Sequence, residues 1–247
     1  IPYHVGGTMQ DWGTSSGPAY VLRGNGAPLV ADFYTVGGGE AGDFVFDREL
    51  PGHIYAGEYS GYISHYQELT GQFRDVTIYP HNMSGHGAED GKYRFQWTAP
   101  IATSAYDPRV LYHGAQVLFR TNDRGVHWEA ISGDLTRNDK SKQKWAGGPL
   151  TGDNTGVEVY DTIFSIAESP VAKDQIWVGT DDGLVQLTRD GGKNWANVTP
   201  AKLPPWATVE GIEASHKDAG TAYVAVDARR LNDVHPYLFR TRDFGKS

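Results

Sequence analysis

Apolar runs separated by short polar turns recur in a fixed order along the chain. A first run is followed by a turn that often carries Pro or Asp, and a second run then ends in a small residue. First runs begin at Phe44, Ile101, Ile163 and Val209, and the second runs end at Gly57, Gly114, Gly179 and Ala225. Short apolar runs bounded by turn residues predict β-strands. The segment 3–7 is similar to the end of a fifth, truncated copy.

Each pair of runs is followed by further runs with turn residues on both sides. Third runs cover 62–66, 117–120, 184–188 and 237–240, and fourth runs cover 73–78, 128–131 and 195–198. Successive copies are spaced 57, 65 and 46 residues apart. Four strands in each repeat of this length predict the blades of a β-propeller. A β-sandwich is the alternative, but it gives no reason for one strand order to occur four times.

We therefore expect an all-β chain that forms a β-propeller of four-stranded antiparallel blades, with about four and a half blades present. The predicted blades cover 1–36, 37–97, 98–160, 161–208 and 209–247, and together they form a single propeller segment over 1–247. The first two strands of each blade are nearly continuously apolar. This pattern fits positions that are packed between neighbouring blades.

A sharper signal lies between the third and fourth strands. Residues 121–128 and 188–195 both have the pattern Thr-x-Asp-x-Gly-x-x-Trp, and a third copy, 241–247, stops one residue before its Trp would fall. In such a turn the Asp accepts backbone N–H bonds, the Gly permits positive φ and the Trp buries a large ring. We assign a structural role to Asp123, Gly125, Trp128, Asp190, Gly192, Trp195, Asp243 and Gly245.

This pattern is similar to the Asp-box, or bacterial neuraminidase repeat, of Asp-box β-propellers. Segments 6–11, 36–40, 97–101 and 118–139 also resemble large secreted bacterial proteins related to sortilin ectodomains and to xyloglucanase-type hydrolases. The resemblance implies an extracellular or periplasmic location and a longer chain with propellers of seven or more blades. The present blades would then be a partial ring or a fragment, because an open arc leaves edge strands unpaired. The remainder of the same chain, or another subunit, is expected to close the ring.

Composition narrows the class of partner. The 247 residues include 31 Gly, 7 Trp, 14 Tyr and 9 Phe, which suits short strands joined by tight turns. The net charge of -8 argues against binding to nucleic acid. The absence of cysteine excludes disulfides, thiolate nucleophiles and cysteine-ligated metals. No apolar stretch approaches the length of about 18 residues that a membrane-spanning helix needs.

Ligand chemistry is expected in the loops that enter the innermost strands, at 79–96, 134–160 and 200–208, because the blades converge there. Aromatic faces stack on sugar rings, and charged groups bond to sugar hydroxyls. The ligand-binding candidates are Trp97, Tyr160, Trp206 and Arg229. The candidate catalytic carboxylates, which would act in pairs as acid and base or nucleophile, are Glu40, Glu58, Asp161 and Asp181. The alternative for each of these acids is a turn residue or a solvated surface residue, as most acidic residues in proteins are.

Two functions stay open. The first is a secreted propeller segment that binds or hydrolyses glycans through its inner-face loops, glycoside hydrolase-like if it is an enzyme. The second is a non-catalytic, sortilin-like propeller that binds a peptide or a protein, or that serves as an assembly scaffold. Sialidase activity is disfavoured, because we find neither three suitably placed arginines nor an Arg-Ile-Pro signature.

No cofactor and no metal site are assigned. His81, His86, Glu89 and Asp90 lie in one loop, but their spacing differs from that of most zinc ligand sets. A structural calcium ion could bind the oxygen-rich segments 134–139 or 181–182. Solvated polar loops are the alternative at both places.

Overall fold

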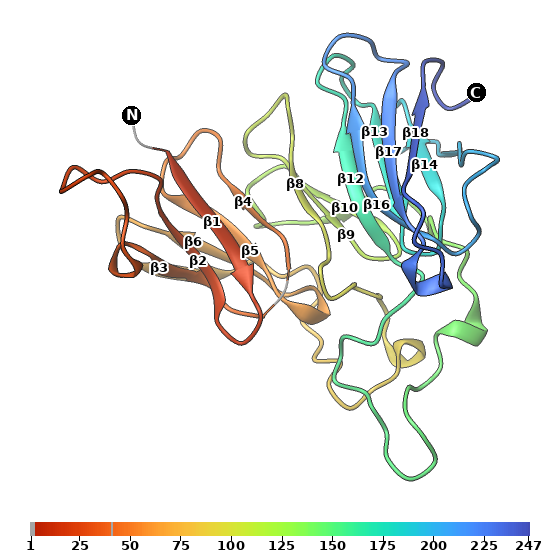
Figure 1. Ribbon diagram of the computed structural model, residues 1–247, viewed down its shortest axis with the longest axis horizontal. Coiled ribbons are helices and arrows are strands. Elements are labelled where there is room, and N and C mark those ends of the chain that lie inside the picture. Colours follow the sequence, from red (N-terminus) through yellow and green to blue (C-terminus); the bar gives the residue numbers. More distant parts are fainter. Residues whose placement is uncertain (1–2, 41) are drawn as a thin grey trace.

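The computed structural model describes residues 3–40 and 42–247 and shows five antiparallel sheets, which we call blades 1 to 5 (Figure 1). Blade 1 contains β1 (His4–Met9), β2 (Gly13–Pro18) and β3 (Tyr34–Gly37). Blade 2 contains β4 (Phe44–Phe46), β5 (His53–Gly57), β6 (Ile63–Gln67) and β7 (Gln72–Asp75). Blade 3 contains β8 (Ile101–Thr103), β9 (Leu111–Gly114), β10 (Leu118–Thr121) and β11 (Glu129–Ala130).

The last two blades repeat this order. Blade 4 contains β12 (Ile163–Glu168), β13 (Ile176–Thr180), β14 (Val185–Thr188) and β15 (Ala196–Asn197). Blade 5 contains β16 (Thr208–Ala214), β17 (Ala222–Asp227) and β18 (Tyr237–Thr241). In every blade each strand pairs with the next strand along the chain.

Helical structure in the described residues is confined to five short 3-10 turns in the connections. They are η1 (Val30–Asp32), η2 (Tyr59–Gly61), η3 (Ala88–Asp90), η4 (Lys140–Lys142) and η5 (Arg229–Leu231). Across 3–40 and 42–247, none of the helices has the length and apolar character needed to cross a membrane.

The blades lie side by side in an open arc. Blade 1 and blade 5 are at opposite ends of Figure 1, and the long connections, drawn in yellow and green, extend below the sheets. The predicted fold class, an all-β partial propeller of antiparallel blades, is confirmed. The predicted blade boundaries stay a prediction. The first predicted blade covers 1–36, and β3 of blade 1 ends one residue later, at Gly37.

Apolar residues from neighbouring blades form the cores. Between blades 4 and 5, Trp177 and Val185 pack with Val209 and Val224. Equivalent clusters join blades 3 and 4, and blades 2 and 3. Because both faces of a central blade are covered, its inner strands carry buried side chains on both sides, as all five residues of β13 do. This explains the nearly continuous apolar runs in the sequence.

The Thr-x-Asp-x-Gly hairpins have one geometry in their three copies. In the first, the Thr121 hydroxyl donates to Asp123 Oδ1 over 2.8 Å and accepts the Gly125 N–H over 2.9 Å. The Asp123 carboxylate also accepts the N–H of His127 at 2.8 Å. The hairpins at Asp190 and Asp243 repeat these bonds. The local turn chemistry thus holds the chain between the third and fourth strands.

The tryptophan of each complete hairpin reaches the preceding blade. Trp128 Nε1 donates to the carbonyl of Val76 over 2.8 Å, and Trp195 Nε1 donates to the carbonyl of Ile131 over 3.1 Å. Each acceptor residue directly follows the outermost strand of the preceding blade: Val76 follows β7, and Ile131 follows β11. The hairpins therefore connect neighbouring blades at their outer edges, in addition to closing a turn.

Candidate functional site

Three aspartates lie together where the connections meet blade 4. Asp161 precedes β12 with a left-handed backbone (φ of 60°), and Asp181 and Asp182 follow β13. All three residues are 0% exposed. Sequence reasoning named Asp161 and Asp181 separately, and the structure brings them together with Asp182. A carboxylate with no exposed surface cannot contact a substrate in this arrangement.

Hydrogen bonds tie the aspartates to the surrounding chain. Asp181 accepts the N–H of Thr162 at 2.8 Å and its hydroxyl at 2.7 Å. Asp182 accepts the N–H of Arg137 at 2.6 Å. The carboxamide of Gln143 donates to Asp161 Oδ2 over 2.8 Å. The long connection 134–160 is therefore fixed to blade 4 through these acids.

A buried arginine, Arg94, links the loop 79–96 to the aspartate cluster. Arg94 Nε donates to the carbonyl of Asp161 over 3.1 Å, and its Nη2 forms an ion pair with Asp134 at 2.9 Å. Arg94 lies in the connection 79–96, so it joins that loop to 134–160. Within 3–40 and 42–247, Asp161 Oδ1 is a buried atom without a hydrogen-bond partner.

Burial raises the pKa values of two of these acids. The pKa of Asp181 rises to about 7, chiefly because burial disfavours the charged form, with Asp182 and Asp161 adding repulsion. Burial likewise raises the pKa of Asp182 to about 6, and the adjacent Asp161 carboxyl raises it further. Near neutral pH the cluster therefore carries protons that exposed aspartates would have lost.

The stability of the fold should depend on these protons. An unfolded aspartate titrates near pH 4, so between about pH 4 and pH 7 the folded state binds more protons than the unfolded state. The contribution of Asp181 is then greatest below about pH 4 and is lost as the pH rises to about 7. We expect the Asp181→Asn variant to lose less stability than the parent between pH 5 and pH 8, measured by urea denaturation.

The matched control is Asp153→Asn, because Asp153 is an exposed residue of the same long connection. It should follow the pH dependence of the parent. Equal pH dependence of Asp181→Asn and the parent would show that Asp181 titrates normally.

An aromatic pair lies beside the aspartates. The Tyr160 hydroxyl donates to the carbonyl of Trp206 over 3.1 Å, and the two rings stack with centroids 6.4 Å apart. Arg137 Cζ and Lys142 Nζ lie 4.9 Å and 4.8 Å from the centroid of the Trp206 ring. We call Tyr160, Trp206, Arg137 and Lys142 the aromatic–basic surface. Both rings are half-buried, whereas both cations are exposed.

The other two predicted ligand-binding residues, Trp97 and Arg229, form hydrogen bonds or ion pairs with residues outside this surface. Trp97 is half-buried, and its Nε1 is a buried atom without a partner among the described residues. Arg229 is exposed, in η5, and its Nε pairs with Asp227 at 2.9 Å. The structure thus brings together two of the four predicted residues, Tyr160 and Trp206.

Of the predicted glutamates, Glu58 has the more distinctive surroundings. It lines a cavity of about 300 Å³ together with Asp75, Arg74 and Tyr62. Burial raises the pKa of Glu58, and the charge of Asp75 raises it further. Glu40 is half-buried and is not among the residues that line this cavity. Neither glutamate contacts the aspartate cluster through any hydrogen bond that the described residues form.

The histidine loop forms no metal site in this structure. His86 Nδ1 lies 3.7 Å from Asp90 Oδ2, and the rings of His81 and His86 are 6.3 Å apart. Over the described ranges, no group of three or more His, Asp or Glu side chains is arranged to hold a metal ion. The expected calcium site stays a prediction.

Sequence reasoning missed Arg94, Arg137, Lys142 and Gln143. Three of them lie in the connection 134–160, which its length had marked as a functional loop. Their roles depend on contacts across 18 to 67 positions, as from Gln143 to Asp161 and from Arg94 to Asp161. No local pattern in the sequence indicates such pairs.

Comparison with known proteins finds similar structures but no similar sequence family. No protein-family model matches the chain, and no curated protein sequence is similar to it. A GH74 xyloglucanase from Xanthomonas campestris is similar in structure, with a TM-score of 0.50 and 19% identity over 80% of this chain and 28% of that enzyme. An ancestral GH74 enzyme is also similar in structure, with a TM-score of 0.52 and 13% identity over 85% of this chain and 24% of that enzyme.

A GH74 enzyme from Niastella koreensis gives the same result, with a TM-score of 0.51 and 12% identity over 84% of this chain and 28% of that chain. This chain therefore spans between 24% and 28% of the length of these three enzymes. At such low identity the likeness concerns the fold alone, and it agrees with the partial β-propeller that the five antiparallel sheets form.

Proposed function

We propose that this propeller segment binds glycans through the aromatic–basic surface. The observation that carries the proposal is the stacked pair of Tyr160 and Trp206, with two exposed cations near the indole. Aromatic side chains supply apolar contact area together with a polar edge, and arginine supplies planar donors. One protein of similar fold is a xyloglucanase, and glycan binding is a function that fits this neighbour.

The charge of the surface favours an acidic glycan. Arg137 and Lys142 are both exposed on it, and the charge of Arg230 is close enough to lower the pKa of Tyr160 against the opposing effects of burial and the aspartates. Arginine forms bidentate bonds with carboxylates and related anions. We therefore propose that the preferred sugars carry carboxylate or sulfate groups.

The buried aspartates support binding at this surface without forming part of a catalytic pair. They hold Arg137 in place through its N–H, and Arg137 Nε donates to the carbonyl of Asp182 over 2.7 Å. Cleavage by Asp161 or Asp181 would require a rearrangement that exposes them, because glycoside hydrolysis needs both carboxyl groups at the scissile bond.

A glycan array tests the proposal. We expect the parent to bind acidic oligosaccharides and Trp206→Ala to lose at least about tenfold in affinity, because the variant removes the ring at the centre of the surface. The backbone of Trp206 has a φ of 68°, and alanine adopts this conformation no less readily than tryptophan. Titration calorimetry with the best array ligand gives the affinities.

The matched control is Trp12→Ala, because Trp12 is 78% exposed and belongs to blade 1. It should keep the affinity of the parent. Equal losses in the two variants, or the binding of peptides with no sugar signal, would favour the alternative of a peptide- or protein-binding propeller or an assembly scaffold.

Glycoside hydrolysis at Glu58 is a second candidate function. This candidate rests on two carboxyl groups, those of Glu58 and Asp75, that line one cavity. The raised pKa of Glu58 suits a general acid, and Asp75 would act as its partner. If this site is active, Glu58→Gln should abolish the release of reducing sugar from a polysaccharide, while Glu40→Gln should retain it. Equal activity of the two variants would exclude Glu58 as the acid.

The cellular location of the protein is also proposed. We propose that the protein is extracellular or periplasmic, as its sequence resemblance implies. Closure of the ring by the remainder of the chain or by another subunit is likewise proposed, since the described blades form an open arc.

A further inference from the structure

A polar cavity of about 340 Å³ lies between blades 3 and 4. Ser104 and Tyr106 line it from blade 3, and Glu168 and Asp174 line it from blade 4. These four residues lie in or beside the loops that join the first and second strands of the two blades. The connection 134–160 enters blade 4 at the other end of β12, so the cavity is separate from the proposed glycan surface.

The same place between blades 2 and 3 can be identified from these loops. The loop between the first two strands is closed in both blades by a backbone hydrogen bond between the same two positions. Asp47 of blade 2 therefore corresponds to Ser104 of blade 3, and Glu49 corresponds to Tyr106. Blade 2 thus has two acids where blade 3 has two neutral side chains.

A guanidinium group fills this place between blades 2 and 3. Arg124 is the fourth residue of the Thr-x-Asp-x-Gly hairpin of blade 3. Its Nε donates to Asp47 Oδ2 over 2.9 Å, and its Nη2 forms an ion pair with Glu49. The Asp47 side chain has no exposed surface, so this ion pair is buried on the side of the acid.

A second guanidinium group lies beside the corresponding hairpin residue between blades 4 and 5. Phe244 is the fourth residue of that hairpin, and Arg189 Cζ lies 3.9 Å from the centroid of its ring. Arg189 directly follows β14 of blade 4 and is the second residue of the preceding hairpin. The following blade supplies the guanidinium in one blade pair, and the preceding blade supplies it in the other.

Neither hairpin position supplies a guanidinium between blades 3 and 4. The fourth position is Gly191, and the second position, which corresponds to Arg189, is Asn122. The nearest atom to a Cβ built on Gly191 is Asp174 Oδ1 at 3.4 Å, an ordinary contact with a residue that lines the cavity. The cavity is therefore the place that an arginine occupies in the neighbouring pair of blades.

Two carboxylates of blade 4 lie at this cavity. Glu168 Oε1 accepts the hydroxyl of Tyr112 at 2.8 Å, and Glu168 Oε2 accepts that of Ser104 at 2.7 Å. Burial raises the pKa of Tyr106, and the charges of Glu168 and Asp174 raise it further. Both acids are thus close to the same wall of the cavity.

The other charged residues of the cavity nearly cancel. Arg120 pairs with Glu129 over 2.7 Å, and Asp107 pairs with Arg109 over 2.8 Å. Lys173, which is exposed, then stands against the two carboxylates of blade 4. The cavity therefore has an excess of negative charge, which favours a cationic ligand.

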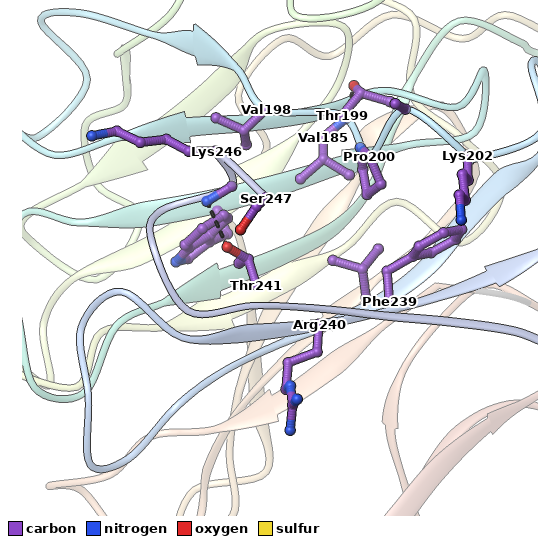
Figure 2. A pocket seen from close by; sticks show the side chains of 14 residues that line it. Val185, Val198, Thr199, Pro200, Lys202, Phe239, Arg240, Thr241, Lys246 and Ser247 are labelled. Carbon is purple, nitrogen blue, oxygen red and sulfur yellow. Dashed lines mark hydrogen bonds between the residues drawn. The ribbon is translucent and has the colours of Figure 1, made fainter.

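The cavity between blades 4 and 5 provides a contrast (Figure 2). Val185, Val198 and Phe239 are among its walls, and its described lining residues include no Asp or Glu. A cation in it would lose hydration without gaining an ion pair. Its volume is also about 340 Å³, so the carboxylates, and not the space, distinguish the cavity between blades 3 and 4.

We propose that the cavity between blades 3 and 4 binds a guanidinium group, either of a small molecule or of an arginine side chain in a peptide. The group would form ion pairs with Glu168 and Asp174, because its planar donors match carboxylate geometry. Tyr106 offers it an aromatic face, as Phe244 does for Arg189.

Calorimetric titration tests the proposal with two guanidinium probes, ethylguanidinium and the tripeptide Gly-Arg-Gly. Butylammonium and Gly-Lys-Gly are the matched controls, because they carry the same charge without the planar donors. We expect saturable binding of at least one guanidinium probe and at least about tenfold weaker binding of its ammonium control. Binding of the tripeptide alone would identify a peptide as the ligand, and binding of both probes would identify the guanidinium group itself.

Gly191→Arg gives the cavity a guanidinium of its own. Arg124 has a φ of 61° and Gly191 has a φ of 72°, so arginine is accommodated in this conformation at the same hairpin position. We expect this variant to lose probe binding and to have a higher urea midpoint than Gly191→Ala. The alanine variant is the matched control, because it has the same backbone strain, leaves the cavity open and should keep binding.

Asp174→Asn tests the site without filling it. Asp174 is exposed and has a φ of 66°, a conformation that asparagine adopts readily. Its replacement should weaken guanidinium binding at least about threefold and leave the urea midpoint unchanged. The proposal would be overturned by the absence of saturable binding to the parent, by equal binding of the ammonium controls, or by equal affinities of the parent and Asp174→Asn.

Discussion

Replacement of Trp195 by alanine is expected to lower the free energy of unfolding by about 3 kcal/mol. The ring packs against the cluster shared by blades 3 and 4, and its Nε1 donates to the carbonyl of Ile131 over 3.1 Å. The substitution leaves a cavity and an unpaired carbonyl at the same place. Urea denaturation followed by circular dichroism measures the loss.

Two further substitutions at tryptophan positions separate packing from hydrogen bonding. Trp195→Phe keeps most of the packing and loses the indole N–H, so its cost should be about 1 kcal/mol. Trp12→Ala removes a ring that is 78% exposed and should cost less than about 0.5 kcal/mol. A loss in Trp195→Ala as small as that in Trp12→Ala would contradict the role of the indole in joining the blades.

Gly192→Ala is expected to destabilise the fold by about 2 to 4 kcal/mol. Gly192 has a φ of 98°, a conformation that costs an L-residue free energy. A Cβ at this position would also collide with the carbonyl oxygen of Ile131, which is the acceptor for Trp195. The backbone of blade 3 and the hairpin of blade 4 would have to separate, and the unfolding midpoint measures that cost.

Gly133→Ala is the control for this substitution. Gly133 has no positive φ, and nothing lies within 4 Å of a Cβ built on it. Its replacement should change the free energy of unfolding by less than about 0.5 kcal/mol. Similar losses for Gly192→Ala and Gly133→Ala would mean that the hairpin does not approach the preceding blade as closely as described.

The repeated strand order could be predicted because the physical environment repeats. Each central blade is covered on both faces, so its inner strands are apolar at almost every position, as in β13. The turns between third and fourth strands need an Asp acceptor and a Gly at fixed offsets, and both recur in the sequence. These requirements are local, and local requirements leave a pattern that the sequence displays.

Contacts between blades could not be predicted in the same way. The sequence indicated that Trp128 and Trp195 bury their rings, but it did not indicate that each indole bonds to the preceding blade. The acceptors lie 52 and 64 positions earlier in the chain. A backbone carbonyl is present at every residue, so nothing in the sequence distinguishes Val76 or Ile131 as an acceptor.

The candidate site was predicted in part for the same reason. Tyr160 and Trp206 were named from residue type and loop position, and they lie together in the structure. Asp161 and Asp181 were named as candidate catalytic acids, and their complete burial depends on loops that close over them. Burial of a carboxylate within irregular chain follows from tertiary packing, and residue type gives no sign of it.

The most direct test of the account is a hydrogen-exchange footprint of the parent protein with an acidic oligosaccharide. We predict slower exchange in the connections 134–160 and 200–208, which carry the aromatic–basic surface, and no such change in Trp206→Ala. Unchanged exchange in both connections, or protection confined to the segments around Glu58 and Asp75, would contradict glycan binding at this surface.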